Sequence, residues 1–354
     1  MFFIVAYFVL IAAASLFAFF ENDDVRKGKT ETMVYVLFVT VLFLLAAFRT
    51  VGIDNDSQNY VDLFYGRANE MVEMEFSFEM ILAMCRAIGD DPRVMFVVYA
   101  LLSIPIKAVG MARASRLWML SLVVWMGYYY IYQDFTQIRV AVSTGIFIFA
   151  LHYLAQGQRV LTFALFLLAI FFHRTAVLYL PLIFLGVKPM SNRWRAVLAA
   201  IPVVGVFINL MHIDPVVFLP VAAVQDKIEL YETMRDSGVM GDEINTFNLV
   251  FLAKLAVFYF LLWKERFIAE AMPAISLYLK IYAYSLFGFF VLSFMPVFAW
   301  RVSELTGVVE VVLFPSMAFA FREKYYGKGL IILYSVMQVL QAMVLSSESI
   351  HPDA

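Results

Sequence analysis

The sequence predicts an all-α polytopic membrane protein with about twelve transmembrane helices, within a range of about 10 to 13, in a single domain of residues 1–354. Hydrophobic residues make up 63% of the chain and charged residues 15%, whereas a soluble domain is nearer half apolar and a quarter charged. The apolar runs are also continuous and do not alternate with a period of two. This excludes a transmembrane β-barrel and leaves helices to satisfy the backbone in hydrocarbon.

The individual spans follow from apolar runs that are long enough, or nearly long enough, to cross a bilayer. The first run lacks a basic leader and a small-residue cleavage site, so we predict a first span and not a removed signal peptide. The sixth to eighth runs are short, and the range in the span count comes from them. In chain order the predicted spans are Phe2–Phe20, Met33–Phe48, Val94–Met111, Leu117–Ile131, Ile138–Leu154, Val160–Phe172, Thr175–Val187, Ala196–Met211, Thr246–Trp263, Ala274–Phe294, Arg301–Phe321 and Leu330–Leu345.

Two long polar segments, residues 50–92 and 212–246, interrupt the spans. Part of the first segment, Glu75–Ile88, carries apolar residues at helical spacing. These are Phe78, Ile81, Cys85 and Ile88. The pattern predicts an amphipathic helix that lies on the membrane.

Lysine and arginine residues collect in the short loops on one alternating side of the spans. By the positive-inside rule this side is cytoplasmic, and both termini and both long polar segments then lie outside. The basic residues on the cytoplasmic side are Arg26, Lys27, Lys29, Arg113, Arg116, Arg159, Lys188, Arg193, Arg195, Lys264, Arg266, Arg322, Lys324 and Lys328. The net charge of −2 gives no indication of a nucleic-acid partner, and the single cysteine permits neither an intrachain disulfide nor a cysteine metal site.

Charged residues nevertheless recur at the outer ends of the spans. From Arg49 to Tyr60 the chain changes abruptly from an apolar run to arginine, aspartate, serine and amide side chains. Alone, this stretch is typical of a solvated loop, and Arg49, which borders it, is expected to tolerate substitution somewhat better than Arg139 and Arg301. Because other charged residues occur at the same ends of the spans, we favour a polar site at the membrane edge. The residues that share this face are Arg49, Asp54, Asp56, Arg139, His173, Arg174 and Arg301.

Arginine inside a span is costly and usually faces the bundle interior or a water-filled cavity. A guanidinium group stays charged and can form two parallel hydrogen bonds to phosphate oxygens. A convergent set of arginines beside lipid therefore suits a lipid-linked phosphate or pyrophosphate. The structural alternative is pairing, of Arg301 with Glu304 one helical turn on, and of Arg139 with Asp134.

Two other features allow both a structural and a functional interpretation. His173 is typical of a hydrogen-bonded packing residue at a membrane edge, but histidine also suits proton transfer near neutral pH. The run of Tyr128, Tyr129, Tyr130 and Tyr132 is typical of the aromatic belt at a bilayer interface, although one or two of these rings could line a saccharide groove. No Walker motif, glycine-rich nucleotide loop, H-E-x-x-H or G-x-S-x-G occurs, so an ATP-driven pump or a zinc protease is unsupported.

The chain resembles the EpsG/Wzy-like family of bacterial polysaccharide polymerases over most of its length. The resemblance lies in four stretches in matching order, namely Arg49-Thr-Val-Gly52-Ile-Asp54 leading to Tyr60, Gln137-Ile-Arg139, Phe172-His173-Arg174-Thr-Ala176 leading to Pro181, and Arg301 late in the chain. The family usually has one aspartate both two residues after the glycine and four before the tyrosine. Here Asp54 meets the first condition and Asp56 the second, and Arg174 stands where the family often has a small residue.

The resemblance implies a GT-C-like membrane glycosyltransferase in the bacterial inner membrane, with its active site facing the periplasm and without a cofactor or metal. A growing glycan on undecaprenyl pyrophosphate would be transferred, with inversion, onto a repeat unit on the same lipid. A chain-length regulator and a flippase are the implied protein partners. The implied catalytic residues are His173, Asp54 and Asp56, with His173 favoured as the base and Asp54 as an orienting group. The implied substrate-binding residues are Arg49, Arg139, Arg301, Arg174, Gln137, Tyr60, Tyr132 and Glu304.

Two other classes remain open. A ligase or a sugar O-acyltransferase would differ in the acceptor or the group transferred, which the sequence does not state. A lipid-linked glycan flippase or transporter should carry paired half-repeats and ionisable groups near the membrane midplane. The chain has no convincing repeat and its charges lie at one face, which disfavours transport.

Overall fold

The computed structural model describes residues 2–24, 27–54, 56–67, 74–211, 249–293 and 296–345, and over these residues the chain is helical and contains no strand. The predicted polar segment 212–246 and the predicted cytoplasmic residue Arg26 lie outside the described residues. In the first half of the chain the helices are α1 (Phe2–Phe20), α2 (Lys29–Ala47), α3 (Ser57–Phe64), α4 (Phe76–Ile88), α5 (Arg93–Ala114), α6 (Trp118–Gly127), the π-helix η1 (Tyr130–Thr136), α7 (Ile138–Ala155) and α8 (Arg159–Phe172).

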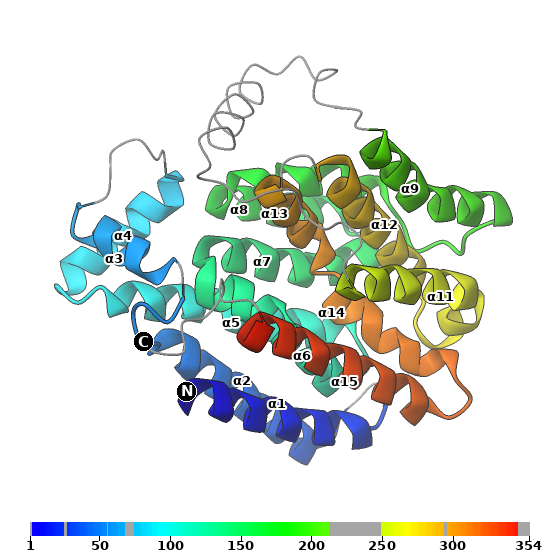
Figure 1. Cartoon of the computed structure of the whole chain (residues 1–354), viewed down its shortest axis with the longest axis horizontal. Helices are drawn as coiled ribbons and strands as arrows, with labels where there is room; N and C mark the ends of the chain where they lie inside the picture. The colour runs from blue at the N-terminus through cyan, green and yellow to red at the C-terminus, as the bar shows by residue number, and fades with distance from the viewer. Residues whose placement is uncertain are drawn as a thin grey trace.

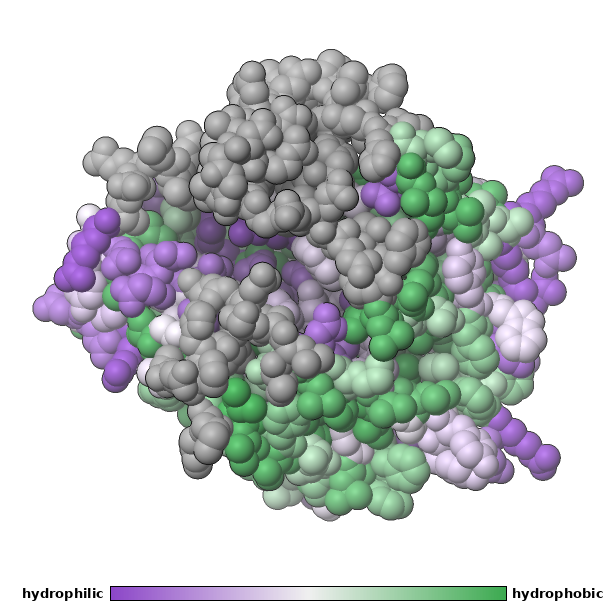
Figure 2. All heavy atoms as spheres, viewed as in Figure 1, coloured by the Kyte–Doolittle hydropathy of each residue, from purple (hydrophilic) through white to green (hydrophobic). Residues whose placement is uncertain are grey.

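The second half continues the bundle. Its elements are the 3₁₀ helix η2 (Arg174–Phe184), α9 (Asn192–Leu210), α11 (Leu249–Ala271), α12 (Ile275–Val291), α13 (Pro296–Gly307), α14 (Glu310–Leu313), the 3₁₀ helix η4 (Phe314–Ala320), α15 (Lys324–Leu340) and the π-helix η5 (Gln341–Leu345). Figure 1 shows the long helices side by side along one direction, with α3 and α4 at the left end and α4 set obliquely to the bundle. Figure 2 shows apolar side chains over the lower middle of the molecule and hydrophilic ones at its left and right ends.

Six helices of the described part are long and apolar enough to cross a membrane, which makes the chain a polytopic membrane protein. They are Phe3–Phe20, Lys29–Ala47, Arg93–Ala114, Ile138–Ala155, Asn192–Leu210 and Ala299–Ala320. Several shorter apolar helices lie among them, and each of the twelve predicted spans overlaps a helical element. The number that crosses the bilayer, and the GT-C-like architecture, stay predictions.

Small residues allow α5 and α7 to pack closely. A Cβ atom added at Gly110 of α5 would lie 2.8 Å from the backbone nitrogen of Phe149, and one added at Gly145 of α7 would lie 2.7 Å from Cγ2 of Ile106. Both distances are shorter than any side chain tolerates, so glycine is required for this backbone approach. Close contact through small residues is the usual way in which helices associate in lipid. It places α5 and α7 side by side.

Two tyrosines of the run after α6, Tyr129 and Tyr130, do not belong to an aromatic belt. Tyr129 is 1% and Tyr130 0% exposed, and the Tyr130 hydroxyl donates to the carbonyl oxygen of Leu42 at 2.6 Å. The Tyr130 ring also stacks on Tyr7. These tyrosines therefore lie inside the bundle, where the π-helix η1 replaces regular α-helix, and the belt interpretation is wrong for them.

Helix α4 confirms the predicted helix but not the whole of its predicted apolar face. Phe78, Ile81 and Cys85 are buried, and the Ser77 hydroxyl donates to the carbonyl oxygen of Phe171 at the end of α8. Ile88, in contrast, is 67% exposed. The packed face of α4 is thus turned toward the bundle, and whether α4 lies on a membrane stays a prediction.

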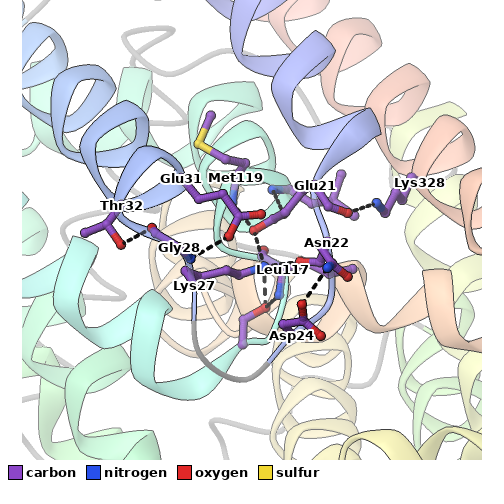
Figure 3. Close-up of polar contacts among 12 residues, drawn as sticks. Glu21, Asn22, Asp24, Lys27, Gly28, Glu31, Thr32, Leu117, Met119 and Lys328 are labelled. Atoms are coloured by element: carbon purple, nitrogen blue, oxygen red, sulfur yellow. Dashed lines mark hydrogen bonds and ion pairs between the residues drawn. The ribbon is translucent and has the colours of Figure 1, made fainter.

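A polar cluster joins the elements at the end of the bundle opposite α3 and α4 (Figure 3). The Glu21 carboxylate accepts hydrogen bonds from the backbone N–H groups of Met119 at 3.1 Å and Leu120 at 3.2 Å, and Lys27 lies 3.1 Å from it. An anion at the start of α6 is stabilised by the helix dipole and by these otherwise unpaired donors. Lys328 of α15 donates to the Glu21 carbonyl oxygen. The cluster thereby ties α1, α6 and α15 together at the predicted cytoplasmic end.

Candidate functional site

Arg49, two residues after the end of α2, is buried and lies against an aspartate, a backbone carbonyl and an aromatic ring. It is 4% exposed, its Nε lies 3.4 Å from Asp54 Oδ2, and its Nη1 donates to the carbonyl oxygen of Asp134 at 3.2 Å. Its guanidinium carbon also lies 4.0 Å from the centre of the Phe96 ring. The expectation that Arg49 borders solvent is therefore wrong, because its charge lies beside Asp54 inside the protein, and its tolerance of substitution stays a prediction.

Asp54 shapes the loop that follows. Its Oδ1 accepts from the backbone N–H groups of Asp56 at 3.1 Å and Ser57 at 2.8 Å, which caps the start of α3. Gly52 adopts φ +88°, a conformation that favours glycine, and its N–H donates to the Ser57 hydroxyl at 2.9 Å. Burial raises the pKa of Asp54 even though Arg49 acts in the opposite direction. With one oxygen on the helix cap and the other beside Arg49, Asp54 has an orienting geometry.

Asp56 lies in a different environment, although it is only two residues away. Its side chain is half-buried at the edge of α3. Burial raises the pKa of Asp56 above its ordinary value, while the positive charges of Arg301 and Arg139 act in the opposite direction. A carboxylate that is held among arginines and is not used as a helix cap can accept a proton or a hydrogen bond from a ligand. Of the two aspartates, Asp56 is therefore the one presented to the site.

Glu75, the residue before α4, holds the centre of the site together. It forms an ion pair with Arg139 through Oε2, and its Oε1 lies 3.3 Å from Nδ1 of His173. Burial alone would raise the pKa of Glu75, but the contact with His173 and the charge of Arg139 outweigh it and lower the pKa to about 2. Sequence analysis used Glu75 only as the start of a helix and missed it as a site residue. No spacing within the sequence links it to residues 64 and 98 positions away.

Arg139 pairs with Glu75, and not with Asp134 as the structural alternative proposed. Besides Glu75 it interacts with the hydroxyl of Tyr60, which is 5% exposed on α3, and its guanidinium lies over the Phe78 ring. Asp134 pairs instead with Lys107 at 2.6 Å. The predicted Arg139–Asp134 pair is therefore wrong, and the structure joins α3, α4 and α7 through one arginine.

Arg174 and Arg301 border the same end of the bundle. Arg174 Nη2 donates to the carbonyl oxygen of Met74 at 3.1 Å, next to Glu75. Arg301 is exposed on α13, and its charge acts on Asp56. Glu304, one turn further along α13, is 6% exposed and accepts a hydrogen bond from Tyr128. No ion pair joins Arg301 to Glu304 in the described part of the chain.

The two remaining predicted site residues lie at the break between η1 and α7. The Gln137 backbone N–H donates to the carbonyl oxygen of Tyr132 at 3.2 Å, and its own carbonyl accepts from Ala141 N–H at 2.9 Å. Gln137 thus begins α7 and places Arg139 in its first turn. The Tyr132 ring packs 4.4 Å, centre to centre, from that of Tyr128. Tyr132 is thus connected through Tyr128 to Glu304.

The arrangement can bind an anion and move a proton. Apart from the neutralised pair of Arg49 and Asp54, three arginines accompany two carboxylates and one imidazole. They are Arg139, Arg174 and Arg301, with Asp56, Glu75 and His173. Among the described residues, no group of three histidine, cysteine, aspartate or glutamate side chains is placed to hold a metal ion. The guanidinium groups are suited to anion recognition, because they can form paired hydrogen bonds to phosphate oxygens.

No curated protein and no solved structure gave a match to this chain. A model of the EpsG family, however, matches residues 32–352, a range that contains every site residue described above. Because this match covers nearly the whole chain, the protein belongs to the EpsG family, the family of Wzy-like polysaccharide polymerases.

Proposed function

We propose that the protein is a polysaccharide polymerase of the bacterial inner membrane with its site on the periplasmic side. It would transfer a growing glycan from undecaprenyl pyrophosphate onto a repeat unit carried by the same lipid. The observation that carries the proposal is the Glu75 carboxylate, which contacts both Arg139 and His173 at the outer end of the bundle. The contact supports the proposal, because Arg139 could stabilise a phosphate leaving group and His173 could accept a proton.

His173 serves as the general base in this proposal. With Nδ1 directed at Glu75, the imidazole tautomer that carries its proton on Nδ1 leaves Nε2 as the acceptor. The acceptor sugar hydroxyl gives its proton to Nε2 while its oxygen attacks the anomeric carbon of the donor. The bond from this carbon to the pyrophosphate oxygen breaks with its electron pair, which inverts the anomeric configuration.

The arginines stabilise the negative charge that develops on the pyrophosphate. Arg301 is exposed and Arg174 is held beside Glu75, so both can approach phosphate oxygens without first breaking the Arg49–Asp54 pair. Preorganised donors aimed at such a charge contribute about 10² to 10³ in rate each. Asp56, on which the charges of Arg301 and Arg139 act, would accept a hydrogen bond from a hydroxyl of the acceptor sugar.

The test is single-turnover glycosyl transfer by the purified full chain with defined undecaprenyl-pyrophosphate-linked repeat units, measured between pH 5 and 9. We expect His173→Gln to lower the rate by about 10² to 10⁴, the usual contribution of a general base, and to change the shape of the pH–rate profile. Asp56→Asn should lower the rate without moving the profile. The reverse pattern would assign the base to Asp56, and a parent enzyme that elongates no glycan would refute the polymerase itself.

A further inference from the structure

An ion pair lies in the interior of the bundle, outside the group of residues that face the site. Lys107 Nζ is 2.6 Å from Asp134 Oδ2, and both side chains are 0% exposed. The Asp134 carboxylate also accepts from the Ser103 hydroxyl at 2.8 Å and from Trp125 Nε1 at 3.1 Å. Burying two charges costs desolvation that their attraction only partly returns. An ionisable pair within a membrane bundle therefore suggests a role other than stability.

The pair is connected to Asp56 through a continuous series of contacts. The carbonyl oxygen of Asp134 accepts from Arg49 Nη1, and Arg49 Nε faces Asp54. The other oxygen of Asp54 caps α3 through the N–H groups of Asp56 and Ser57. A displacement of the main chain at Asp134 would therefore reach the start of α3 through Arg49.

The same pair is connected to the helix that carries Arg139. Lys107 Nζ also lies 3.4 Å from Oε1 of Gln133, and this oxygen accepts from the Thr144 hydroxyl of α7 at 2.8 Å. Asp134 and Gln133 both belong to η1, whose end leads directly into α7. A π-helix is rare and has few favourable contacts of its own, and such segments occur frequently at functional sites. The side chains of α5 and α6 therefore hold η1 in place.

We propose that the Lys107–Asp134 pair is a positioning element, which locks η1 so that the Asp56 loop and the start of α7 keep their places relative to each other. Neither residue touches the ligand. The expected loss of glycosyl transfer rests on the proposed function. The positioning of η1 and of the Asp56 loop does not, because it is a property of the fold. Both residues are unassigned by sequence reasoning, which mentioned Asp134 only as a partner of Arg139.

The decisive variant is the double substitution Lys107→Met with Asp134→Asn. It removes both charges together, so neither is left buried alone, and the asparagine can still bond to Ser103 and Trp125. We expect the purified full chain to accumulate and unfold at nearly the parental temperature. Hydrogen exchange at the backbone amides of Asp56 and Ser57 should become at least about tenfold faster. Glycosyl transfer should fall by about 10²-fold through kcat, as expected for a small misplacement of catalytic groups.

The matched control is the pair Arg195 and Glu265, which joins α9 to α11 near the opposite end of the bundle. Arg195→Met with Glu265→Gln should leave both the exchange at α3 and the transfer rate unchanged. Parental exchange and parental transfer in the Lys107/Asp134 variant would overturn the proposal. If that variant fails to accumulate, Ser103→Ala, which removes a single bond to Asp134, should still speed exchange at Asp56, and parental exchange would again overturn it. Altered exchange in a protein whose parent transfers no glycan would uphold the positioning role while rejecting the polymerase.

Discussion

Replacing Glu75 by glutamine tests the centre of the candidate site. The side chain keeps its shape but loses the charge that contacts Arg139 and His173. The fall in the Glu75 pKa from 4.5 to about 2 corresponds to about 3 kcal/mol, at about 1.4 kcal/mol for each pH unit. This free energy is the amount by which the native fold favours the ionised carboxyl group. Glu75→Gln should therefore lower the free energy of unfolding near pH 7 by up to about 3 kcal/mol.

The pH dependence of stability supplies a second measurement. Because the pKa of Glu75 is lower in the folded than in the unfolded state, its contribution to stability is complete above about pH 4.5 and is lost as the pH falls toward 2. The difference in unfolding free energy between the parent and Glu75→Gln should thus shrink when unfolding in detergent is measured at pH 3 instead of pH 7. A difference that stays constant would mean that Glu75 is not held as an ion in the fold.

Activity should fall more than stability predicts. Without a carboxylate on Nδ1, the His173 imidazole loses the group that selects its tautomer, and the loss of such an orienting acid can lower a rate by up to about 10⁴-fold. The assay is single-turnover transfer by folded protein. Glu79→Gln is the matched control, because Glu79 is an exposed glutamate one turn along the same helix. A Glu75→Gln enzyme as fast as the Glu79→Gln enzyme would refute the assignment of Glu75 as the orienting group.

Three further predictions follow from single features of the structure. Arg139→Lys should insert normally yet lose at least about tenfold in transfer, because one ammonium group cannot replace a fork that contacts both Glu75 and Tyr60; parental transfer would show that charge alone suffices. In a variant without the native cysteine, a cysteine at the exposed position Gln58 should react with a membrane-impermeant thiol reagent outside intact cells, and one at Thr30 should not; the opposite pattern would reverse the orientation. Gly52→Ala should lower the unfolding free energy by about 1 to 2 kcal/mol because φ is +88°, and unchanged thermal unfolding would contradict this strain.

Those parts of the fold that depend on local sequence were predictable. Hydropathy is a property of neighbouring residues, and α1, α2 and α7 begin and end within a few residues of the predicted spans. The gathering of Arg139, His173 and Asp56 at one end was also predictable, because helices that alternate in direction bring every second loop to the same side. That these residues lie at the same end of the bundle does not, however, determine which of them are in contact.

Partners that are distant in sequence could not be predicted. Lys254 and Glu310, for which the sequence offered no role, form an ion pair at 2.9 Å within the bundle, and Glu310 also accepts from Tyr282 at 2.8 Å. The pairs made by Lys107 and by Glu75 are of the same kind. Each pair depends on which faces of two helices meet. Packing across the whole bundle, such as the close approach at Gly145, determines these faces, and no pattern in the sequence shows them.

The two aspartates show how packing resolves an ambiguity that spacing leaves open. Asp54 stands at the expected distance from the glycine and Asp56 at the expected distance from the tyrosine, so spacing alone cannot separate them. The structure places Asp54 against a buried arginine that has no access to solvent, and its other oxygen on a helix cap. A group with both oxygens engaged cannot accept a proton without giving up the cap or the ion pair. We therefore propose that Asp56 carries the chemistry at this loop, while the pair of Arg49 and Asp54 supports the loop from inside the bundle.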